Sequence, residues 1–578
     1  MRETCPADSA MMRSVSGFAS HDAARWRLRG GEPVRAMPTT ADPRREDSSP
    51  TGAPPPGRGL EAVFRIAMVV AMVGVLPAIA WLYSTLPPSP DQWQLDYTGW
   101  LLTRGEAPYV DIRDGNWPAA HWLHSLSVAV SGPGFGGWRR FDLFLLTLGV
   151  IAGASLCSRI WGRSAALWFG LLYPWLYVTA GYWFAGQRDI VATHFSLVAL
   201  AGHWAIVQGG HRGLASLAGA SLTTATLVKP TFAILAGVIA LHATLLAMLR
   251  RISWTASLQS VALIAIWSIA ALFAAVGVLL FQGATLESFW EHAVESMLIR
   301  IPGDSLPPGK ALRSALDVTL GSWHWIAVGG IAATVLALRG RSPRELSGVL
   351  LCWLFVLAGL ASSVAQGHGW SYYLAPVFTG LVLLLCGALG QATRLAAQPG
   401  ISRVFAVIGI AIALGGAVKK TWTAYGPLLP VLTSGAPWQE WEDRFPAGDD
   451  LTASDARALA EELRPWLPDG ASMLVWGRVN LLNLLVERPQ PTGFYHKPHV
   501  QRDYLPDRFR LPWTREIIED LTERPPTVVV IDTQTRFKDT AIRKFIEEML
   551  AARYRKLRTA GATTVYLALD AEAGGNNP

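Results

Sequence analysis

Long uninterrupted runs of apolar residues constrain this chain more than any other feature. A helix that crosses the hydrocarbon core of a bilayer needs about 20 mostly apolar residues, and eleven segments of the sequence approach or exceed that length. The fifth and the last are short for the thickness of the hydrocarbon. The segments are 62–84, 141–157, 165–184, 190–207, 214–228, 231–249, 255–281, 322–338, 345–362, 372–389 and 404–418. We therefore predict an α-helical polytopic membrane protein with about eleven transmembrane helices.

The composition supports a lipid environment. Of the 578 residues, 51% are hydrophobic and only 16% are charged, whereas soluble proteins carry about 25% charged residues. The 25 tryptophans and 54 glycines fit a membrane protein, which uses them at the water interface and where helices pack closely. The net charge of +7 comes without a basic face on a recognisable nucleic-acid-binding fold. The predicted partner is the lipid bilayer, and no nucleic acid is expected.

The short connections between the apolar segments indicate an orientation. Membrane proteins concentrate lysine and arginine in their cytoplasmic loops, and arginine occurs in each of the connections SRIWGR, QGGHRG, LRRIS, RGRSPRE and GQATRLAAQPGISR. With these connections inside the cell, the N-terminus is cytoplasmic. An odd number of spans then leaves residues 419–578 outside. We predict a multi-pass protein of the plasma or inner membrane.

The two ends of the chain differ from the transmembrane part, 61–420. Residues 1–60 are rich in Arg, Pro, Gly and Ser without apolar periodicity, so we expect a disordered cytoplasmic tail. Residues 421–578 alternate β-branched runs with helical patterns, which predicts a small extracytoplasmic α/β domain. The runs are 471–477, 527–532 and 563–569, and the helical patterns are 453–465, 513–523 and 538–556. This domain has no Gly-rich phosphate loop, so we expect it to be structural or to guide substrate.

The first external loop, residues 85–140, is rich in acidic and aromatic side chains. Connections of this length are usually functional or disordered, and its seven Trp and Tyr residues argue against disorder. The pattern LDYTGWLLTRG, residues 95–105, predicts an amphipathic helix that lies on the outer interface and ends at Gly105. Asp91 would lie at the N-terminal end of this helix, where it either caps the helix or belongs to a functional site.

This loop resembles the first external loop of the GT-C superfamily of polytopic glycosyltransferases, which includes protein O-mannosyltransferase-like and aminoarabinose-transferase-like branches. An acidic residue after the first span, here Asp91, precedes the segment GEAPYVDIRDGNWPAAHWL, residues 105–123. Its "G..PY.D" turn is matched by Gly105, Pro108, Tyr109 and Asp111.

Two positions depart from the family pattern, and three other segments follow it. Ala119 replaces the usual second proline, and Gln92 replaces the usual acidic neighbour of the first Asp. The similar segments are GQRD (186–189), LVKPTFAIL (227–235) and HGWSYYLAP (368–376), and a C-terminal domain after the last span also fits.

The resemblance implies an activity. GT-C enzymes transfer a sugar, hexosyl or pentosyl, from a polyprenyl-phosphate carrier to an acceptor on the external membrane face, with inversion at the anomeric carbon. Here the acceptor would be a cell-envelope glycan, lipid or protein. The acceptor hydroxyl must lose a proton, which a carboxylate can take, and the leaving lipid phosphate must be stabilised, which fixed cations can do.

We expect these roles to fall on residues at the external ends of the spans. Asp91 is the first candidate for the general base and Asp189 the second, although Asp189 beside Arg188 also reads as a surface ion pair. Lys229 is the favoured phosphate ligand, and the alternative is a lysine that snorkels to the interface. His368 either binds the phosphate or acceptor or has a purely structural role. The candidate substrate-binding residues are Lys229, Arg188, His368, Tyr109, Arg113 and Tyr372.

The sequence is compatible with a divalent metal cofactor. Asp96, Asp111 and Asp114 are candidates to hold a divalent cation together with Asp91 or Asp189, and some GT-C branches use a metal. Because Gln92 removes a tight acidic pair, we expect catalysis without a metal.

Two other classes of function remain. A polytopic transporter or flippase of a lipid-linked or small substrate would show internal repeats and polar groups deep in the membrane, and the sequence shows no repeat. A non-catalytic envelope scaffold would present residues 419–578 to a partner.

Overall fold

Helices make up most of the chain. The computed structural model describes residues 58–299, 305–398, 400–447, 451–495, 505–532, 540–560 and 563–573. The predicted tail, 1–60, lies outside the described residues up to position 57, so its predicted disorder stays a prediction.

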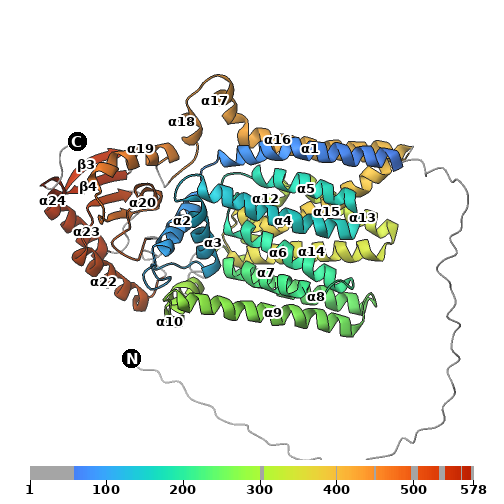
Figure 1. Cartoon of the computed structure of the whole chain (residues 1–578), viewed down its shortest axis with the longest axis horizontal. Helices are drawn as coiled ribbons and strands as arrows, with labels where there is room; N and C mark the ends of the chain where they lie inside the picture. Colours follow the sequence, from blue (N-terminus) through green and yellow to red (C-terminus); the bar gives the residue numbers. More distant parts are fainter. Residues whose placement is uncertain are drawn as a thin grey trace, which may run out of the picture. The chain divides into compact units, whose positions relative to one another are not determined.

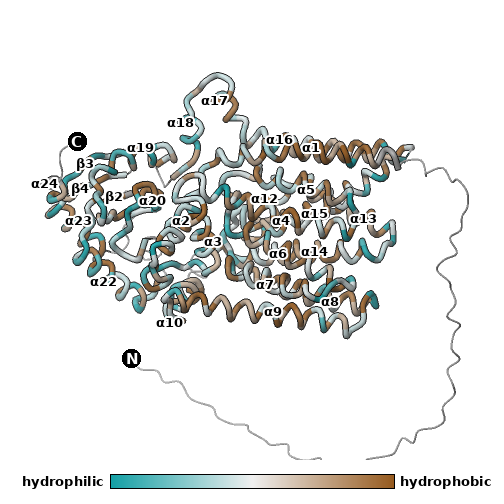
Figure 2. Tube along the Cα trace, in the orientation of Figure 1, coloured by the Kyte–Doolittle hydropathy of each residue, from teal (hydrophilic) through white to brown (hydrophobic). Residues whose placement is uncertain are grey.

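Each of the eleven predicted apolar segments falls on a helix of one bundle (Figure 1). In Figure 2 the long helices at its rim are largely apolar along their length. The bundle helices are α1 (Arg58–Ser84), α4 (Gly137–Trp161), α5 (Arg163–Val178), α6 (Arg188–Val207), α7 (Leu214–Val228), α8 (Ile234–Met248), α9 (Trp254–Phe281), α13 (His324–Gly340), α14 (Pro343–Gln366), α15 (Ala375–Ala396) and α16 (Ile401–Tyr425). The single-turn helices η1 (Pro230–Ala233) and η3 (Ser371–Leu374) begin the segments that contain α8 and α15.

The described part of the chain has eight helices that are long and apolar enough to cross a membrane, so the protein is a multi-pass membrane protein. The number is nine if α13 is counted together with α12 (Pro308–Ser322), from which it is bent by 89°. Two of the eleven predicted segments, those on α5 and α7, are then not counted as spans. These helices have 16 and 15 residues, fewer than the about 20 that span the hydrocarbon.

The helix predicted to lie on the membrane interface is instead buried. It is α2 (Pro90–Thr103), and it packs against α3 (Pro118–Ser131). Its residues from Gln92 to Leu101 are all buried. The aromatic residues that suggested an interfacial helix, among them Trp93 and Tyr97, contact the C-terminal part of the chain. An apolar face predicts burial, but it does not say whether lipid or protein covers it.

The C-terminal region forms the predicted α/β arrangement. Its four strands lie in the order β1 (Met473–Trp476), β2 (Val528–Asp532), β4 (Thr563–Ala568) and β3 (Tyr554–Ala560), with β1 and β2 parallel and the others antiparallel. The three predicted strands are present, and β3 takes the end of a predicted helix. The remaining helices are α17 (Leu429–Thr433), α18 (Trp438–Glu442), α19 (Ala453–Leu463), α20 (Leu481–Val486), α22 (Asp507–Glu523), α23 (Thr540–Arg553) and α24 (Leu569–Ala573).

Both faces of this sheet are covered. Alternate side chains of a strand point to opposite faces, so Met473 and Val475 pack with α19 and α20, whereas Leu474 and Trp476 pack with α22 and α23. The predicted boundary at 420–421 falls within α16, which continues to Tyr425.

The C-terminal region packs on the loop that carries α2 and α3. The Gln490 amide donates to the Tyr97 hydroxyl at 2.8 Å, and Arg113 forms an ion pair with Glu516 at 2.7 Å. A second connection, with α10 (Leu286–Phe289) and the π-helical turn η2 (Trp290–Glu295), also reaches α22. There the Trp513 indole donates to Glu291 at 2.8 Å.

Candidate active site

Most of the predicted site residues lie at one end of the bundle, which we call the loop end. There α1, α5, α7, α14 and α16 finish, and α4, α6, α8 and α15 begin. Asp91 lies in the first turn of α2, Arg188 and Asp189 in the first turn of α6, Lys229 between α7 and η1, and Tyr372 in η3.

Asp189 and Lys229 form a buried ion pair. The Lys229 ammonium lies 2.9 Å from Asp189 Oδ2, and the two side chains are 10% and 1% exposed, respectively. Pro230 cannot continue the hydrogen bonding of α7, so Lys229 takes an extended backbone conformation between two helices. Its ammonium also lies 4.2 Å from the centre of the Tyr373 ring. The pairing of Asp189 with Lys229 replaces the pairing with Arg188 that the sequence suggested.

Asp91 lies in a segment that is hydrogen-bonded, through Gln92 and Ala185, to the segment before Asp189. It is half-buried, and it is not the cap of α2, because Ser89 and Gln92 form the capping box. The charges of Asp91, Asp189 and Arg188 all act on the Tyr372 hydroxyl. Two carboxylates and the Arg188 cation thus act on Tyr372, and the Lys229 ammonium lies over the ring of the next residue, Tyr373.

Arg188 lies beside two residues of the first loop, His124 and Trp138, for which the sequence predicted no role in the site. It lines a narrow pocket with His124 and Trp138, and the His124 ring stacks on the Trp138 ring with centroids 3.5 Å apart. Asp96 lies 2.6 Å from His124 Nδ1. Burial lowers the pKa of His124, although the hydrogen bond to Asp96 opposes this shift. Among the described residues, Arg188 Nε is buried without a hydrogen-bond partner.

A buried arginine of α4, also missed in the sequence, holds the loop end together. Arg139 is completely buried. Its guanidinium donates to the carbonyl oxygens of Leu86, Pro87 and Ala185 at 3.2, 2.7 and 2.8 Å, and to the Tyr83 hydroxyl at 2.9 Å. An arginine near the end of the predicted loop 85–140 gives no sign of such contacts, which only the packing of distant segments creates.

Tyr109 and Arg113 have partners in the loop and the C-terminal region. Tyr109 is fully buried and its hydroxyl donates to the Asn116 carbonyl at 2.7 Å. Arg113 donates to Glu516 and, at 2.9 Å, to the Tyr109 carbonyl. Both side chains therefore serve the packing of the loop.

His368 lies in the turn before η3. Its Nδ1 is 2.5 Å from the Gln366 carbonyl oxygen, and its ring contacts the rings of Trp370 and Tyr373. Through Tyr373, His368 is connected to Lys229.

The acidic residues considered for a metal have other partners. Asp96 binds His124, as described above, and Asp114 lies 2.6 Å from His121 Nε2. The exposed Asp111 accepts from the Ala107 amide. Across the described ranges, no group of three His, Cys, Asp or Glu side chains is placed to hold a metal ion. The residues present do not fit a metal site, and we derive no step through one.

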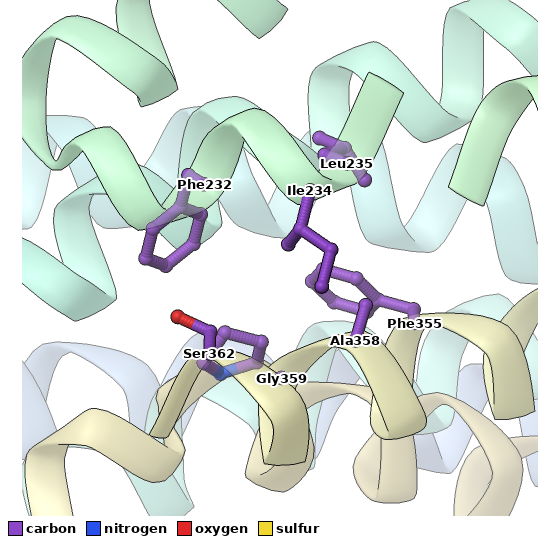
Figure 3. A pocket seen from close by; sticks show the side chains of 8 residues that line it. Phe232, Ile234, Leu235, Phe355, Ala358, Gly359 and Ser362 are labelled. Atoms are coloured by element: carbon purple, nitrogen blue, oxygen red, sulfur yellow. The ribbon is translucent and has the colours of Figure 1, made fainter. Parts of the chain in front are cut away.

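An apolar pocket lies next to the ion pair. Its wall begins at Phe232, in the single-turn helix that follows Lys229, and continues with Phe355 and Pro376 of α14 and α15 (Figure 3). Ser362 is the polar side chain of this lining in Figure 3.

A wider cavity of about 310 Å³ opens elsewhere at the loop end. It is lined by the ends of α1, α5 and α16 and by Tyr182, Trp183 and Arg444. The Tyr182 hydroxyl donates to the Pro88 carbonyl at 3.0 Å, so this cavity borders the segment that leads to Asp91.

No protein-family profile and no curated protein sequence matches the chain. Solved structures do match. ArnT from Cupriavidus metallidurans in the apo state aligns with a TM-score of 0.55 over 89% of this chain and 100% of that one, at 14% identity. The same protein bound to undecaprenyl phosphate aligns with a TM-score of 0.53 over 86% and 97%, again at 14% identity. The apo oligosaccharyltransferase from Archaeoglobus fulgidus aligns with a TM-score of 0.45 over 86% and 74%, at 12% identity.

At such low identity the likeness to ArnT concerns the fold, and it covers the helical bundle and the C-terminal region together. The chain therefore has the fold of ArnT, in agreement with the GT-C-like fold that the resemblance of its first loop implied.

Proposed function

We propose that this chain is an inverting glycosyltransferase that moves a hexosyl or pentosyl unit from a polyprenyl-phosphate donor to a cell-envelope acceptor. The observation that carries the proposal is the buried pair of Asp189 and Lys229 beside Arg188 and Asp91, at the loop end of a GT-C fold. The likeness to ArnT, which has been solved with undecaprenyl phosphate, supports a polyprenyl phosphate as the ligand.

Lys229 and Arg188 bind the donor phosphate in this proposal. When the bond between the anomeric carbon and the phosphate oxygen breaks, its electron pair leaves with the carrier, and fixed cations stabilise that charge. Asp189 holds the Lys229 ammonium in place, while His368 and Tyr372 contact the phosphate or the sugar.

Asp91 is the general base. Its carboxylate takes the proton of the acceptor hydroxyl as the oxygen attacks the anomeric carbon from the face opposite the phosphate. The half-buried position of Asp91 leaves it open to an acceptor. The cavity of about 310 Å³ lined by Tyr182 supports an approach of the acceptor from the Asp91 side.

The site lies on the outer face of the plasma or inner membrane. The connections at the other end of the bundle carry the arginines that favour the cytoplasm. The loop end, with the C-terminal region packed on it, is then outside, where lipid-linked sugars are used.

The test uses membranes that contain the protein and a panel of radiolabelled polyprenyl-phosphate monosaccharides. We expect loss of label from one donor. Asp91→Asn removes the base and should lower this rate at least about 100-fold, the lower range of general acid–base catalysis. Lys229→Met should abolish it, with the protein still in the membrane.

The matched control is Glu106→Gln, which removes an exposed carboxylate just after the C-terminal end of α2 and should keep the wild-type rate. Full activity in Asp91→Asn would disprove the assigned base. Movement of the labelled lipid across vesicle membranes without transfer of sugar would favour a flippase instead.

A further inference from the structure

Two chain segments supply the charged residues of the proposed site. The first, 86–92, leads from α1 into α2 and carries Asp91. The second, 185–189, leads into α6 and carries Arg188 and Asp189. Neither segment forms a regular strand or helix before its helix begins, so other contacts must fix the distance between them.

Arg139 connects these two segments through one guanidinium group. Two of its nitrogens donate to the carbonyl oxygens of Leu86 and Pro87 in the first segment, and the third donates to Ala185 in the second. The guanidinium is planar and rigid, so hydrogen bonds in three directions fix the relative position of the groups that accept them. Lysine, with a single ammonium on a flexible stem, cannot reproduce this geometry.

Two glutamines add further connections between the same segments. The Gln92 side chain donates to the Ala185 carbonyl, and Gln187 Nε2 donates to the Ser89 hydroxyl at 3.1 Å. Gln92 and Gln187 are direct neighbours of Asp91 and Arg188. The hydrogen bonds therefore reach the residues adjacent to the proposed catalytic and phosphate-binding side chains.

Gly186 makes room for this arrangement. Its φ is +72°, a conformation that side chains disfavour. A Cβ atom there would lie 2.7 Å from the Trp138 indole nitrogen and 3.0 Å from both Arg139 Nη1 and the Gln92 amide nitrogen. The first residue of the GQRD segment is thus a glycine because the two segments and Arg139 meet at its Cα.

The Arg139 guanidinium is itself held from the other side. Tyr83 and Tyr177 both donate hydrogen bonds to Asp142, one helical turn after Arg139, and the Tyr83 hydroxyl accepts from Arg139. The Tyr177 hydroxyl also accepts from the Gly186 amide at 2.8 Å. These hydrogen bonds hold the Arg139 side chain in one position, as is necessary for a residue that fixes the distance between two segments.

We propose that Arg139 is a positioning residue, which fixes the distance between Asp91 and the segment that carries Arg188 and Asp189, and so aligns the general base with the leaving phosphate. This inference rests on the proposed function. Arg139 touches no substrate, so its effect is on the geometry of the reacting groups. A displacement of about 1 Å can cost about 100-fold in rate while binding is retained.

The experiment compares Arg139→Lys with Arg140→Lys. Arg140 is the neighbouring, exposed arginine, which donates to Ser131. With the active donor and its acceptor, we expect Arg139→Lys to lower kcat about 100-fold and to change the donor KM less than about threefold. Arg140→Lys should change neither. An unchanged kcat in folded Arg139→Lys, or a raised KM with unchanged kcat, would overturn the proposal.

Hydrogen exchange provides a readout that needs no activity. In Arg139→Lys the amides of 86–92 and of 185–189 should exchange faster together, whereas Arg140→Lys should leave both segments as in the wild type. Unchanged exchange in Arg139→Lys would refute the connection even if transfer is never observed. If the wild type shows no transfer but both segments respond together, the proposed function fails and the connection stands.

Gln187→Ala covers the case in which Arg139→Lys does not fold. It removes one connection and leaves the guanidinium in place, so we expect a smaller fall in kcat, about tenfold, with an unchanged donor KM. A folded Gln187→Ala protein with wild-type kcat and wild-type exchange in both segments would count against the proposal.

Discussion

The buried ion pair of Asp189 and Lys229 yields the sharpest prediction about stability. The two charges are 2.9 Å apart, which at an effective dielectric constant of about 20 corresponds to about 6 kcal/mol of attraction. Desolvation offsets much of this attraction, so the pair itself contributes little net stability. Removing one partner is different, because the remaining charge keeps its desolvation cost.

Lys229→Met should therefore lower the free energy of unfolding by about 3–5 kcal/mol, since it leaves the Asp189 carboxylate, 1% exposed, without its partner. The double variant Asp189→Asn with Lys229→Met should recover to within about 1 kcal/mol of the wild type, because neither charge is then buried. The assay is unfolding of the purified protein in mixed micelles with increasing denaturing detergent, followed by tryptophan fluorescence. Lys310→Met, which removes an exposed cation of α12, is the control and should change stability by less than about 0.5 kcal/mol.

The reasoning is refuted if Lys229→Met is as stable as Lys310→Met, or if the double variant is as unstable as Lys229→Met alone. Either result would mean that water or lipid headgroups solvate Asp189, and that the buried pair does not exist in the membrane.

Three further predictions concern the loop end. In Asp91→Asn, the unfolding midpoint should stay within about 2 °C of the wild type while transfer is lost, because Asp91 is half-buried and surface changes cost little; a fall of the midpoint comparable to that of Lys229→Met would make Asp91 structural. Burial lowers the pKa of His292 to about 3, so the folded protein keeps this histidine neutral while the unfolded chain takes up a proton below about pH 6.5. The free energy of unfolding should therefore decrease as the pH falls from about 6.5 toward about 3. His292→Phe should show a smaller drop in melting temperature between about pH 7.5 and about pH 5 than the wild type. A Cβ at Gly99 would lie 2.5 Å from the His124 backbone, so Gly99→Ala should destabilise by about 1–3 kcal/mol, whereas Gly74→Ala, where the Cβ meets open space, should be neutral in the same unfolding assay.

Much of the fold could be predicted because the bilayer imposes a length and a polarity on each helix. The apolar segments coincide with bundle helices, and the three β-branched runs became β1, β2 and β4. β3 was missed because Tyr554–Ala560 carries three basic residues, which mask a strand at the edge of a sheet.

The sequence pointed to charged residues at the ends of the helices, but it did not predict which of them form pairs. Asp91, Asp189 and Lys229 drew attention because ionisable residues at the ends of apolar segments are costly without a partner or a task. That Asp189 pairs with Lys229 and not with Arg188 depends on how α6 and α7 lie side by side, which no local pattern encodes. Tyr109 and Arg113 matched a motif, yet their contacts are with the loop and with Glu516.

The sequence by itself determined that this chain crosses a membrane many times, carries a small α/β region and concentrates charge at the ends of its helices. These features follow from local composition and from periodicities of a few residues. Only the tertiary structure decided that Arg139, Gln92 and Gln187 join the two charged segments, and that α2 is buried under protein and not under lipid. The physical reason is that such contacts join residues about 50 to 400 positions apart, and their partners are fixed by packing, to which hydrogen bonds add direction.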